Sequence, residues 1–192
     1  MWLLAPVAAL VLLAACPPPA TALEAGDAAP ALAAKDVRGR ALAVPASGRV
    51  LLLSFASPAD GEAVGEITRA IRVEHAELEI VSFIDLSGFP GFARGVVTRE
   101  IEQRHEQAVR KTRAAFDEAG KRAPEDLDAR IHIVPDFDAR SCARYGAGDG
   151  GQRPVIVVVG ANGRVETILA PARALSDVKA AVERALNAHP PR

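Results

Sequence analysis

Apolar residues in this chain occur either in short continuous runs or at every third or fourth position. Short runs of β-branched and aliphatic residues are typical of strands buried on both faces of a sheet, whereas the wider spacing is typical of helices with one buried face. The predicted strands are 50–55, 78–84, 131–134, 155–159 and 164–169, with a short alternating stretch at 41–44. One predicted helix begins at Ser57, and three others span 93–122, 138–145 and 174–188. Strands that alternate with helices in this way predict an α/β fold.

The first of these helices follows directly on the strand 50–55. Ser57 suits an N-cap, Pro58 suits the first helical position, and Asp60 and Glu62 place negative charge in the first turn. The strand 78–84 comes next, so this part of the chain is predicted to be a βαβ unit.

The long helix at 93–122 has an apolar stripe on one side and mixed charges on the other. Basic and acidic residues alternate along the charged side, which indicates a solvated face; the alternative is a docking surface for an anionic partner. Further along, Asn162 and Gly163 separate two apolar runs, which is a strong signal for a tight β-hairpin.

The chain opens with an uncharged apolar run at 2–16, and its first charge is Glu24. The run is too short to span a bilayer but has the length of a secretory signal. Leu13–Cys16 resembles the lipobox of bacterial lipoproteins, in which the cysteine is lipidated, whereas Ala20–Ala22 resembles an ordinary cleavage site. We therefore expect a leader at 1–22 and one domain at 23–192, exported to the periplasm or anchored by a lipid on Cys16.

Composition sets limits on the partners of that domain. The full chain has 192 residues, 23 basic and 24 acidic side chains and a net charge of −1, so nothing in it points to nucleic acid. Its two cysteines are Cys16 and Cys142. Once Cys16 is lipidated or removed, a single thiol remains and an internal disulfide is impossible.

Several motifs occur in the order typical of the redoxin (AhpC/TSA-like) branch of the thioredoxin-like superfamily, and together the chain resembles that branch. The motifs are G-D-A-A-P at 26–30, D-V-R-G-R at 36–40, the segment 48–57, R-P-V at 153–155 and A-N-G-R at 161–164. The resemblance implies a central mixed β-sheet flanked by helices, with the long helix inserted before the fourth strand region. It also implies a cis-proline at Pro154 and a peptide-binding cleft. The implied cleft residues are Ser57, Asp60, Glu62, Arg153 and Pro154.

The chain departs from the family where redox chemistry would take place. The two cysteine positions of a thioredoxin C-x-x-C align with Ala59 and Glu62, and a peroxiredoxin alignment finds neither the threonine nor the cysteine that it requires. Asp60 and Glu62 would also raise the pKa of a neighbouring thiol. Copper-delivery relatives use C-x-x-x-C, which is also missing, and none of the four histidines has metal-ligand spacing. We therefore expect no metal and no cofactor.

Three hypotheses follow for the function. The first is a redox-inactive binding or accessory protein of the cell envelope, whose cleft binds an extended segment of a protein or peptide partner by strand-like pairing. The second is a one-cysteine oxidoreductase or peroxidase, in which Arg140 and Arg144 could lower the pKa of Cys142. The third is a structural lipoprotein without a ligand.

Overall fold

The computed structural model describes residues 23–46, 48–147, 153–172 and 174–189. The predicted leader at 1–22, with the predicted lipidation site at Cys16 and the predicted cleavage site after Ala22, lies outside the described residues. The strands are β1 (Leu32–Lys35), β2 (Ala41–Val44), β3 (Leu51–Ala56), β4 (Glu79–Asp85), β5 (Ile131–Asp136), β6 (Val155–Val159) and β7 (Val165–Leu169). The helices are α1 (Gly61–Glu74), the short 3₁₀ helix η1 (Gly91–Ala93), α2 (Arg94–Glu118), α3 (Leu127–Arg130), α4 (Arg140–Arg144) and α5 (Leu175–Ala188).

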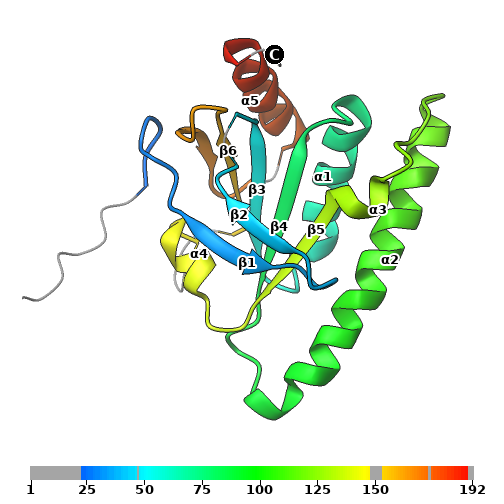
Figure 1. The fold of residues 1–192 in the computed structure, drawn as a ribbon, viewed down its shortest axis with the longest axis vertical. Coiled ribbons are helices and arrows are strands. Elements are labelled where there is room, and N and C mark those ends of the chain that lie inside the picture. The colour runs from blue at the N-terminus through cyan, green and yellow to red at the C-terminus, as the bar shows by residue number, and fades with distance from the viewer. Residues whose placement is uncertain (1–22, 47, 148–152, 173, 190–192) are drawn as a thin grey trace, which may run out of the picture.

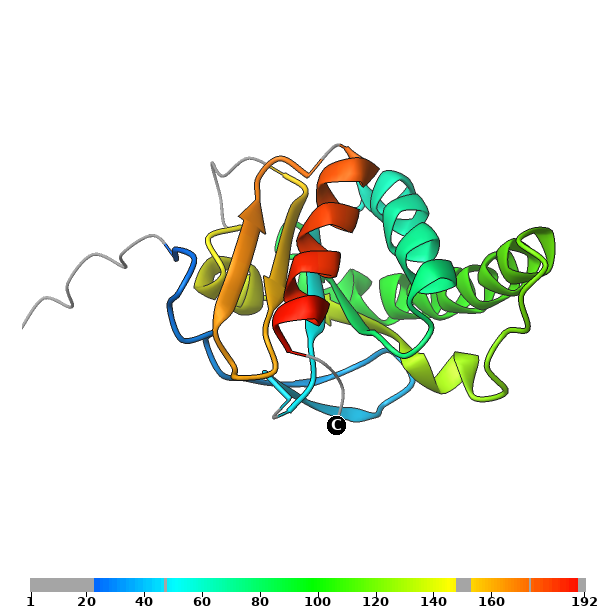
Figure 2. The same ribbon diagram turned by 90° about the horizontal axis from the view of Figure 1, so that it is seen from above.

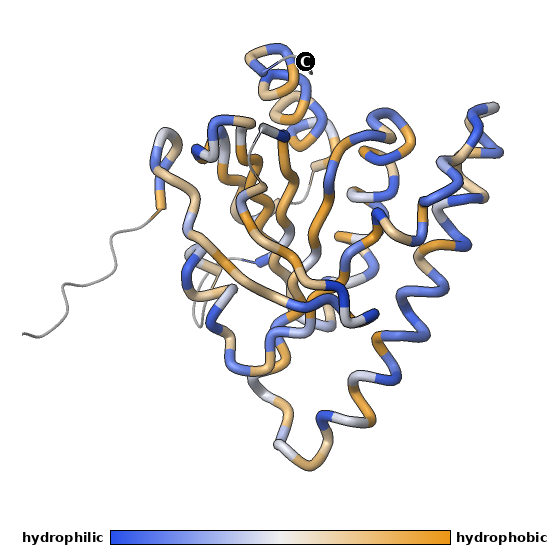
Figure 3. Tube along the Cα trace, in the orientation of Figure 1, coloured by the Kyte–Doolittle hydropathy of each residue, from blue (hydrophilic) through white to orange (hydrophobic). Residues whose placement is uncertain are grey.

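Five strands form a mixed sheet in the order β5-β4-β3-β6-β7 (Figure 1). β3, β4 and β5 run parallel, while β6 and β7 are antiparallel to their neighbours. The central strands β3 and β6 are buried at every position, because both of their faces are covered. The hydropathy trace has its apolar segments concentrated in these strands (Figure 3). The predicted central mixed sheet flanked by helices is therefore confirmed.

Different elements cover the two faces of the sheet (Figures 1 and 2). On one face, α1 and α5 pack on Leu52, Ile80, Ile156 and Val158. On the other face, the β1–β2 hairpin and α4 enclose a second core around Phe55 and its neighbours. α2 contacts α1 and the edge strand β5.

The long helix, α2, spans most of the predicted range. Its buried residues, Ile101, His105, Thr112 and Phe116, recur at helical spacing as the sequence pattern predicted. Most of its other side chains are polar and exposed, which agrees with the predicted solvated face. The Asn162–Gly163 turn also forms as predicted, with Gly163 in the left-handed region at φ 75° and the amide of Gly160 donating to the carbonyl of Arg164 at 2.8 Å.

Two predictions about local structure were wrong. β1 lies in a segment for which we predicted no strand, because four residues rich in alanine carry little strand signal of their own. Cross-strand pairing with β2 and the burial of Leu32 stabilise it. The first helix begins at Gly61 rather than just after Ser57, and Asp60 takes the position of its N-cap.

The topology brings three loops to one end of the sheet. β3 and β4 are parallel, so the segments after Ala56 and after Asp85 leave from the same end. β6 is antiparallel to β3 and begins at Val155 opposite Phe55, so Arg153 and Pro154 enter the sheet at that end too. The candidate functional site lies at this end of the sheet.

Candidate functional site

The segment between β3 and α1 forms a turn that Asp60 closes. The hydroxyl of Ser57 donates to Oδ2 of Asp60 at 2.6 Å, and the amide of Ser57 donates to the same oxygen at 3.3 Å. Asp60 therefore reaches back toward β3, and its side chain makes no capping hydrogen bond to α1. The sequence could not reveal this, because Ser57 and Asp60 are both good capping residues and only their local conformation decides between them.

A pocket of about 400 Å³ lies between the start of α1 and the loop before β6. Its lining includes Asp60, Ala63 and Glu66 from the α1 side and Arg153 and Pro154 from the opposite side. The Arg153–Pro154 peptide bond is cis, as the resemblance implied. We call this pocket the cleft. Three of the five residues predicted for it, Asp60, Arg153 and Pro154, line it.

The other two predicted cleft residues lie elsewhere. The hydroxyl of Ser57 is used in the turn with Asp60 and does not line the cleft. Glu62 points toward α2, where its Oε1 lies 3.7 Å from Nζ of Lys111. An α-helix turns by about 100° per residue, so two positions in its first turn point in different directions. A linear motif cannot say which of them faces the cleft.

Arg153 is held by an ion pair beneath the cleft. Its Nη2 lies 2.7 Å from Oδ2 of Asp85, and its Nε donates to the carbonyl of Ala147 at 3.0 Å. Burial alone would raise the pKa of Asp85, but hydrogen bonds from Ser87 and Arg153 outweigh it and hold that pKa below its ordinary value. The guanidinium therefore serves the structure of the loop, and sequence reasoning missed its partner Asp85.

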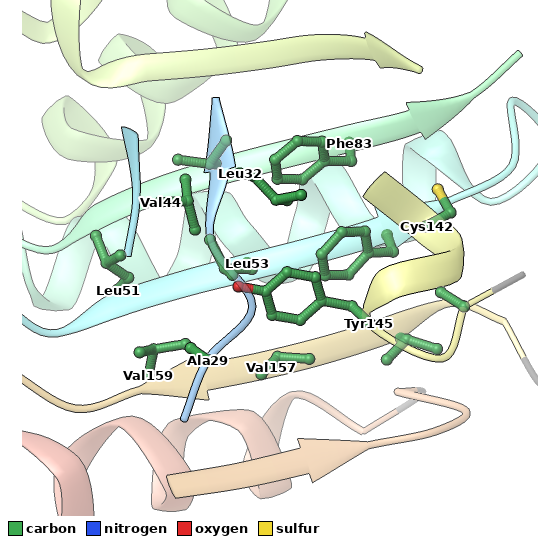
Figure 4. Close-up of a cluster of buried hydrophobic side chains, with 14 of the residues drawn as sticks. Ala29, Leu32, Val44, Leu51, Leu53, Phe83, Cys142, Tyr145, Val157 and Val159 are labelled. Atoms are coloured by element: carbon green, nitrogen blue, oxygen red, sulfur yellow. The ribbon is translucent and has the colours of Figure 1, made fainter. Parts of the chain in front are cut away.

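Cys142 is the buried residue of α4 (Figure 4), and it does not line the cleft. Its side chain is 1% exposed and belongs to the core that contains Phe55 and Tyr145. Its amide donates to Oδ2 of Asp136 at 2.9 Å. Burial, together with the nearby carboxyls of Asp136 and Asp85, raises the pKa of Cys142 to about 12.

The suggestion that two arginines lower the pKa of Cys142 was wrong. Nε of Arg140 lies 2.9 Å from Oδ2 of Asp138, and Arg144 donates to the carbonyl of Ala31 at 2.7 Å. Neither guanidinium is turned toward the thiol, because each finds an oxygen near the surface. Adjacency in sequence therefore misled the electrostatic argument.

We expect Cys142 to resist alkylation in the folded protein. At pH 8, a pKa near 12 leaves about a thousandfold less thiolate than the ordinary thiol pKa would, and burial blocks the reagent as well. Iodoacetamide labelling followed by intact mass is expected to be at least about a thousandfold slower in buffer than in guanidinium chloride. Labelling of the native protein at the rate of a free thiol would contradict this placement.

His132 and His189 each pair with a carboxylate. Nδ1 of His132 lies 3.0 Å from Oδ2 of the buried Asp36, which also pairs with Nε of Arg40 at 2.6 Å. Nε2 of His189 lies 2.9 Å from Oε1 of Glu166. Within 23–46, 48–147, 153–172 and 174–189, no group of three or more histidine, cysteine, aspartate or glutamate side chains could hold a metal ion.

A second pocket, of about 460 Å³, lies between α1, α2 and the sheet. We call it the interhelical pocket. Ser54 and Ser82 lie in it on the sheet side, Gly65 and Arg72 on α1, and Ala108 on α2. Sequence reasoning missed it, although a glycine in the middle of a helical stripe and two serines in apolar strands were visible signals.

No helix among the residues that the structure describes is long and apolar enough to cross a membrane.

Comparison with known proteins shows which fold the chain shares with solved structures. No protein-family model matches the sequence, and no curated protein matches it. A thiol:disulfide interchange protein of the thioredoxin family from Chlorobium tepidum TLS has a similar structure, with a TM-score of 0.53 and 15% identity over 82% of this chain and 94% of that one. A putative thiol:disulfide interchange protein DsbE from Chlorobium tepidum gives 0.51 and 18% over 88% and 99%.

A peroxiredoxin-like protein from Aquifex aeolicus is a third similar structure, with a TM-score of 0.51 and 14% identity over 85% of this chain and 88% of that one. At these identities the likeness establishes the architecture and leaves the chemistry to the residues of this chain. The mixed sheet and the helices on its faces agree with that architecture. The described part of the chain therefore has the thioredoxin-like fold, with no cysteine in its cleft.

Proposed function

We propose that this chain is an exported thioredoxin-fold protein without thiol redox activity, which binds an extended segment of a partner protein in the cleft. One observation carries the proposal. The positions at the start of α1 where the resemblance expects thiols hold Ala59 and Glu62, and the one cysteine among the described residues is buried away from the cleft. Thiol exchange needs an accessible thiolate, which this arrangement does not provide.

Backbone geometry supports the binding role. The carbonyl of Pro154 accepts a hydrogen bond from Ala172 at 2.7 Å, whereas among the described residues the amide and carbonyl of Arg153 have no partner. Unpaired backbone groups beside a sheet are suited to pairing with an extended segment. The ion pair between Arg153 and Asp85 holds this short stretch in place.

Apolar side chains at the same end of the sheet also support a protein partner. Phe92, Val96 and Phe89, which follow β4, are 91%, 72% and 39% exposed. Exposed large apolar side chains that gather near one another favour contact with another protein.

The leader at 1–22 supports export, and Cys16 supports a lipid anchor in the cell envelope. The intact mass of the mature protein tests this directly. A lipidated N-terminal Cys16 and a free N-terminus at Leu23 differ in mass by more than the lipid alone. A mass that still includes the leader would contradict export.

The redox half of the proposal is tested with the mature chain in insulin-reduction and peroxide-consumption assays. We expect rates equal to the blank with dithiothreitol, both for the wild type and for Cys142→Ala. Activity above the blank that Cys142→Ala abolishes would overturn the proposal in favour of a one-cysteine oxidoreductase.

The binding half is tested by photo-crosslinking in the host envelope, with a benzophenone amino acid in place of Glu66, which is exposed and lines the cleft. We expect one discrete protein adduct. Ala63→Arg should abolish it, because Ala63 lines the cleft, whereas Ala114→Arg, at an exposed alanine of α2 outside the cleft, should preserve it. Adducts that persist in Ala63→Arg would contradict the cleft as the binding site.

A further inference from the structure

The interhelical pocket has a polar floor in an otherwise apolar layer. The strand register places Ser54 beside Ser82 and Ser82 beside Ile133, on the sheet face that α1 and α2 cover. The hydroxyl of Ser54 donates to Oγ of Ser82 at 2.9 Å. The hydroxyl proton of Ser54 is used in this hydrogen bond, and the hydroxyl of Ser82 can donate its proton to a group in the pocket. Above and below this row, Ile80, Ile84 and Ile131 line apolar walls.

Two glycines of α1 keep the pocket open. Gly61 and Gly65 lie one turn apart on the stripe that faces the pocket. A Cβ placed on either glycine would meet no atom within 4 Å, and neither residue has a positive φ. Glycine lowers helix stability relative to alanine, so a helical glycine ordinarily has a reason in close packing or in backbone conformation. Gly61 is the first residue of α1, where this cost is small. Neither reason applies to Gly65, which lies inside the helix, and what Gly65 provides is empty space.

Two short side chains of α2 face the glycines of α1, between longer polar side chains at the rim. Ala108 and Thr112 lie one turn apart and line the pocket, and the hydroxyl of Thr112 is used by the carbonyl of Ala108 at 2.7 Å. Small residues on both helices therefore leave the volume between them unfilled. The pocket has a volume of about 460 Å³ and is open to solvent at its rim, where the exposed residues Glu62, Glu100 and Lys111 line it.

Positive charge predominates around the pocket. Glu100 lies 3.2 Å from Nε of Arg104, and Glu62 lies 3.7 Å from Nζ of Lys111, so each acid at the rim has a basic partner. Two further guanidiniums, Arg69 and Arg72, line the pocket and have no carboxylate partner among the described residues.

Arg72 is the more unusual of the two, because it is 3% exposed. Its Nη1 and Nη2 donate to the carbonyls of Leu78 and Arg130, at 3.2 and 2.9 Å. Carbonyl oxygens hold the guanidinium in place but do not neutralise its charge. No carboxylate among the described residues forms an ion pair with this guanidinium, and Glu79 acts on it only from a longer distance. Burying a charge that is not closely paired is costly, and an anion in the adjoining pocket would offset that cost.

We propose that the interhelical pocket binds a small organic anion with an apolar body, such as a carboxylate or a sulfonate. Its charged group lies toward Arg69 and Arg72, and its apolar part lies over the isoleucines between α1 and α2. The volume is within the range of small-molecule sites. This site shares no lining residue with the cleft, so the inference stands or falls independently of the proposed function.

A pair of fluorescent probes tests the proposal on the mature chain: 1-anilinonaphthalene-8-sulfonate, which is anionic, and N-phenyl-1-naphthylamine, its neutral counterpart. We expect saturable binding of the sulfonate at one site. Gly65→Leu should weaken it at least about tenfold, because the new side chain fills the pocket. Gly65→Ala should keep the affinity within about threefold and raise the midpoint of thermal unfolding, because alanine favours the helix.

The charge assignment has its own control. Arg69→Met should weaken binding of the sulfonate about tenfold, the loss of one charge-assisted hydrogen bond, and should change binding of the neutral probe far less. If Gly65→Leu does not fold, Ala108→Leu fills the same space from α2 and decides the question. The absence of saturable binding, or binding that is unchanged in the leucine variant, overturns the site. Equal losses for both probes in Arg69→Met overturn the anionic ligand.

Discussion

Replacing Arg153 with methionine is expected to lower the free energy of unfolding at pH 7 by about 3 to 5 kcal/mol. The pair between Arg153 and Asp85 is largely buried, with side-chain exposures of 19% and 5%. Methionine keeps much of the side-chain volume but leaves the Asp85 carboxylate with Ser87, whose amide donates to it at 2.9 Å, as its remaining hydrogen-bond partner among the described residues. The cost is that of an ionised carboxylate that stays buried after its counter-charge has gone.

The effect of this variant is expected to depend on pH in a defined direction. The pKa of Asp85 in the folded wild type is below its ordinary value, so its stabilising contribution is present above the unfolded-state pKa and is lost as the pH falls through the folded-state pKa. In Arg153→Met, burial acts without the opposing guanidinium and favours the protonated carboxyl. The difference between the two proteins should therefore be largest at neutral pH and should shrink toward the ordinary carboxyl range near 4.

Urea denaturation of both proteins between pH 4 and 8 measures this effect. Arg122→Met is the matched control, because Nη2 of Arg122 lies 2.8 Å from Oε1 of Glu125 in a pair that is more than four-fifths exposed on both sides. It should cost less than about 1 kcal/mol at any pH. A loss in Arg153→Met no larger than that of the control would show that the pair beneath the cleft contributes little.

Tyr145→Ala is expected to cost about 3 to 5 kcal/mol of unfolding free energy, the range for removing a large buried aromatic side chain. Tyr145 stacks on Phe55 with 4.9 Å between ring centroids, and Phe55 stacks on Phe83 at 5.0 Å. Figure 4 shows Tyr145 and Phe83 in this core. The hydroxyl of Tyr145 donates to the carbonyl of Pro30 at 2.8 Å, which ties the segment before β1 to α4. The substitution therefore opens a cavity and releases that segment at the same time.

Thermal and urea unfolding of three variants separates these contributions. Tyr145→Phe keeps the ring and removes one hydrogen bond, so it should cost only about 1 kcal/mol. Phe92→Ala removes an aromatic ring that is 91% exposed, and its effect should stay within about 0.5 kcal/mol. A cost for Tyr145→Ala as small as that of Phe92→Ala would contradict the position of Tyr145 in the core.

The sequence by itself determined the features that rest on neighbouring residues. The continuous apolar run at 50–55 requires a strand covered on both faces, the three-to-four spacing along 93–122 requires a helix, and Asn162–Gly163 requires a tight turn, because each is a property of a few consecutive residues. The same holds for the missing thiol pair, since a residue type that is not encoded at a position cannot act there.

The tertiary structure alone decided which side chains meet. Cys142 is buried beside Asp136, Arg153 lines the cleft but pairs with Asp85, and Glu62 points toward α2. These contacts depend on the packing of elements that are distant in sequence. β1 was missed for the same reason: its stability comes from pairing with β2. The interhelical pocket is the clearest case. A glycine at position 65 and serines at 54 and 82 have no common meaning until α1, α2 and the sheet bring them around one space.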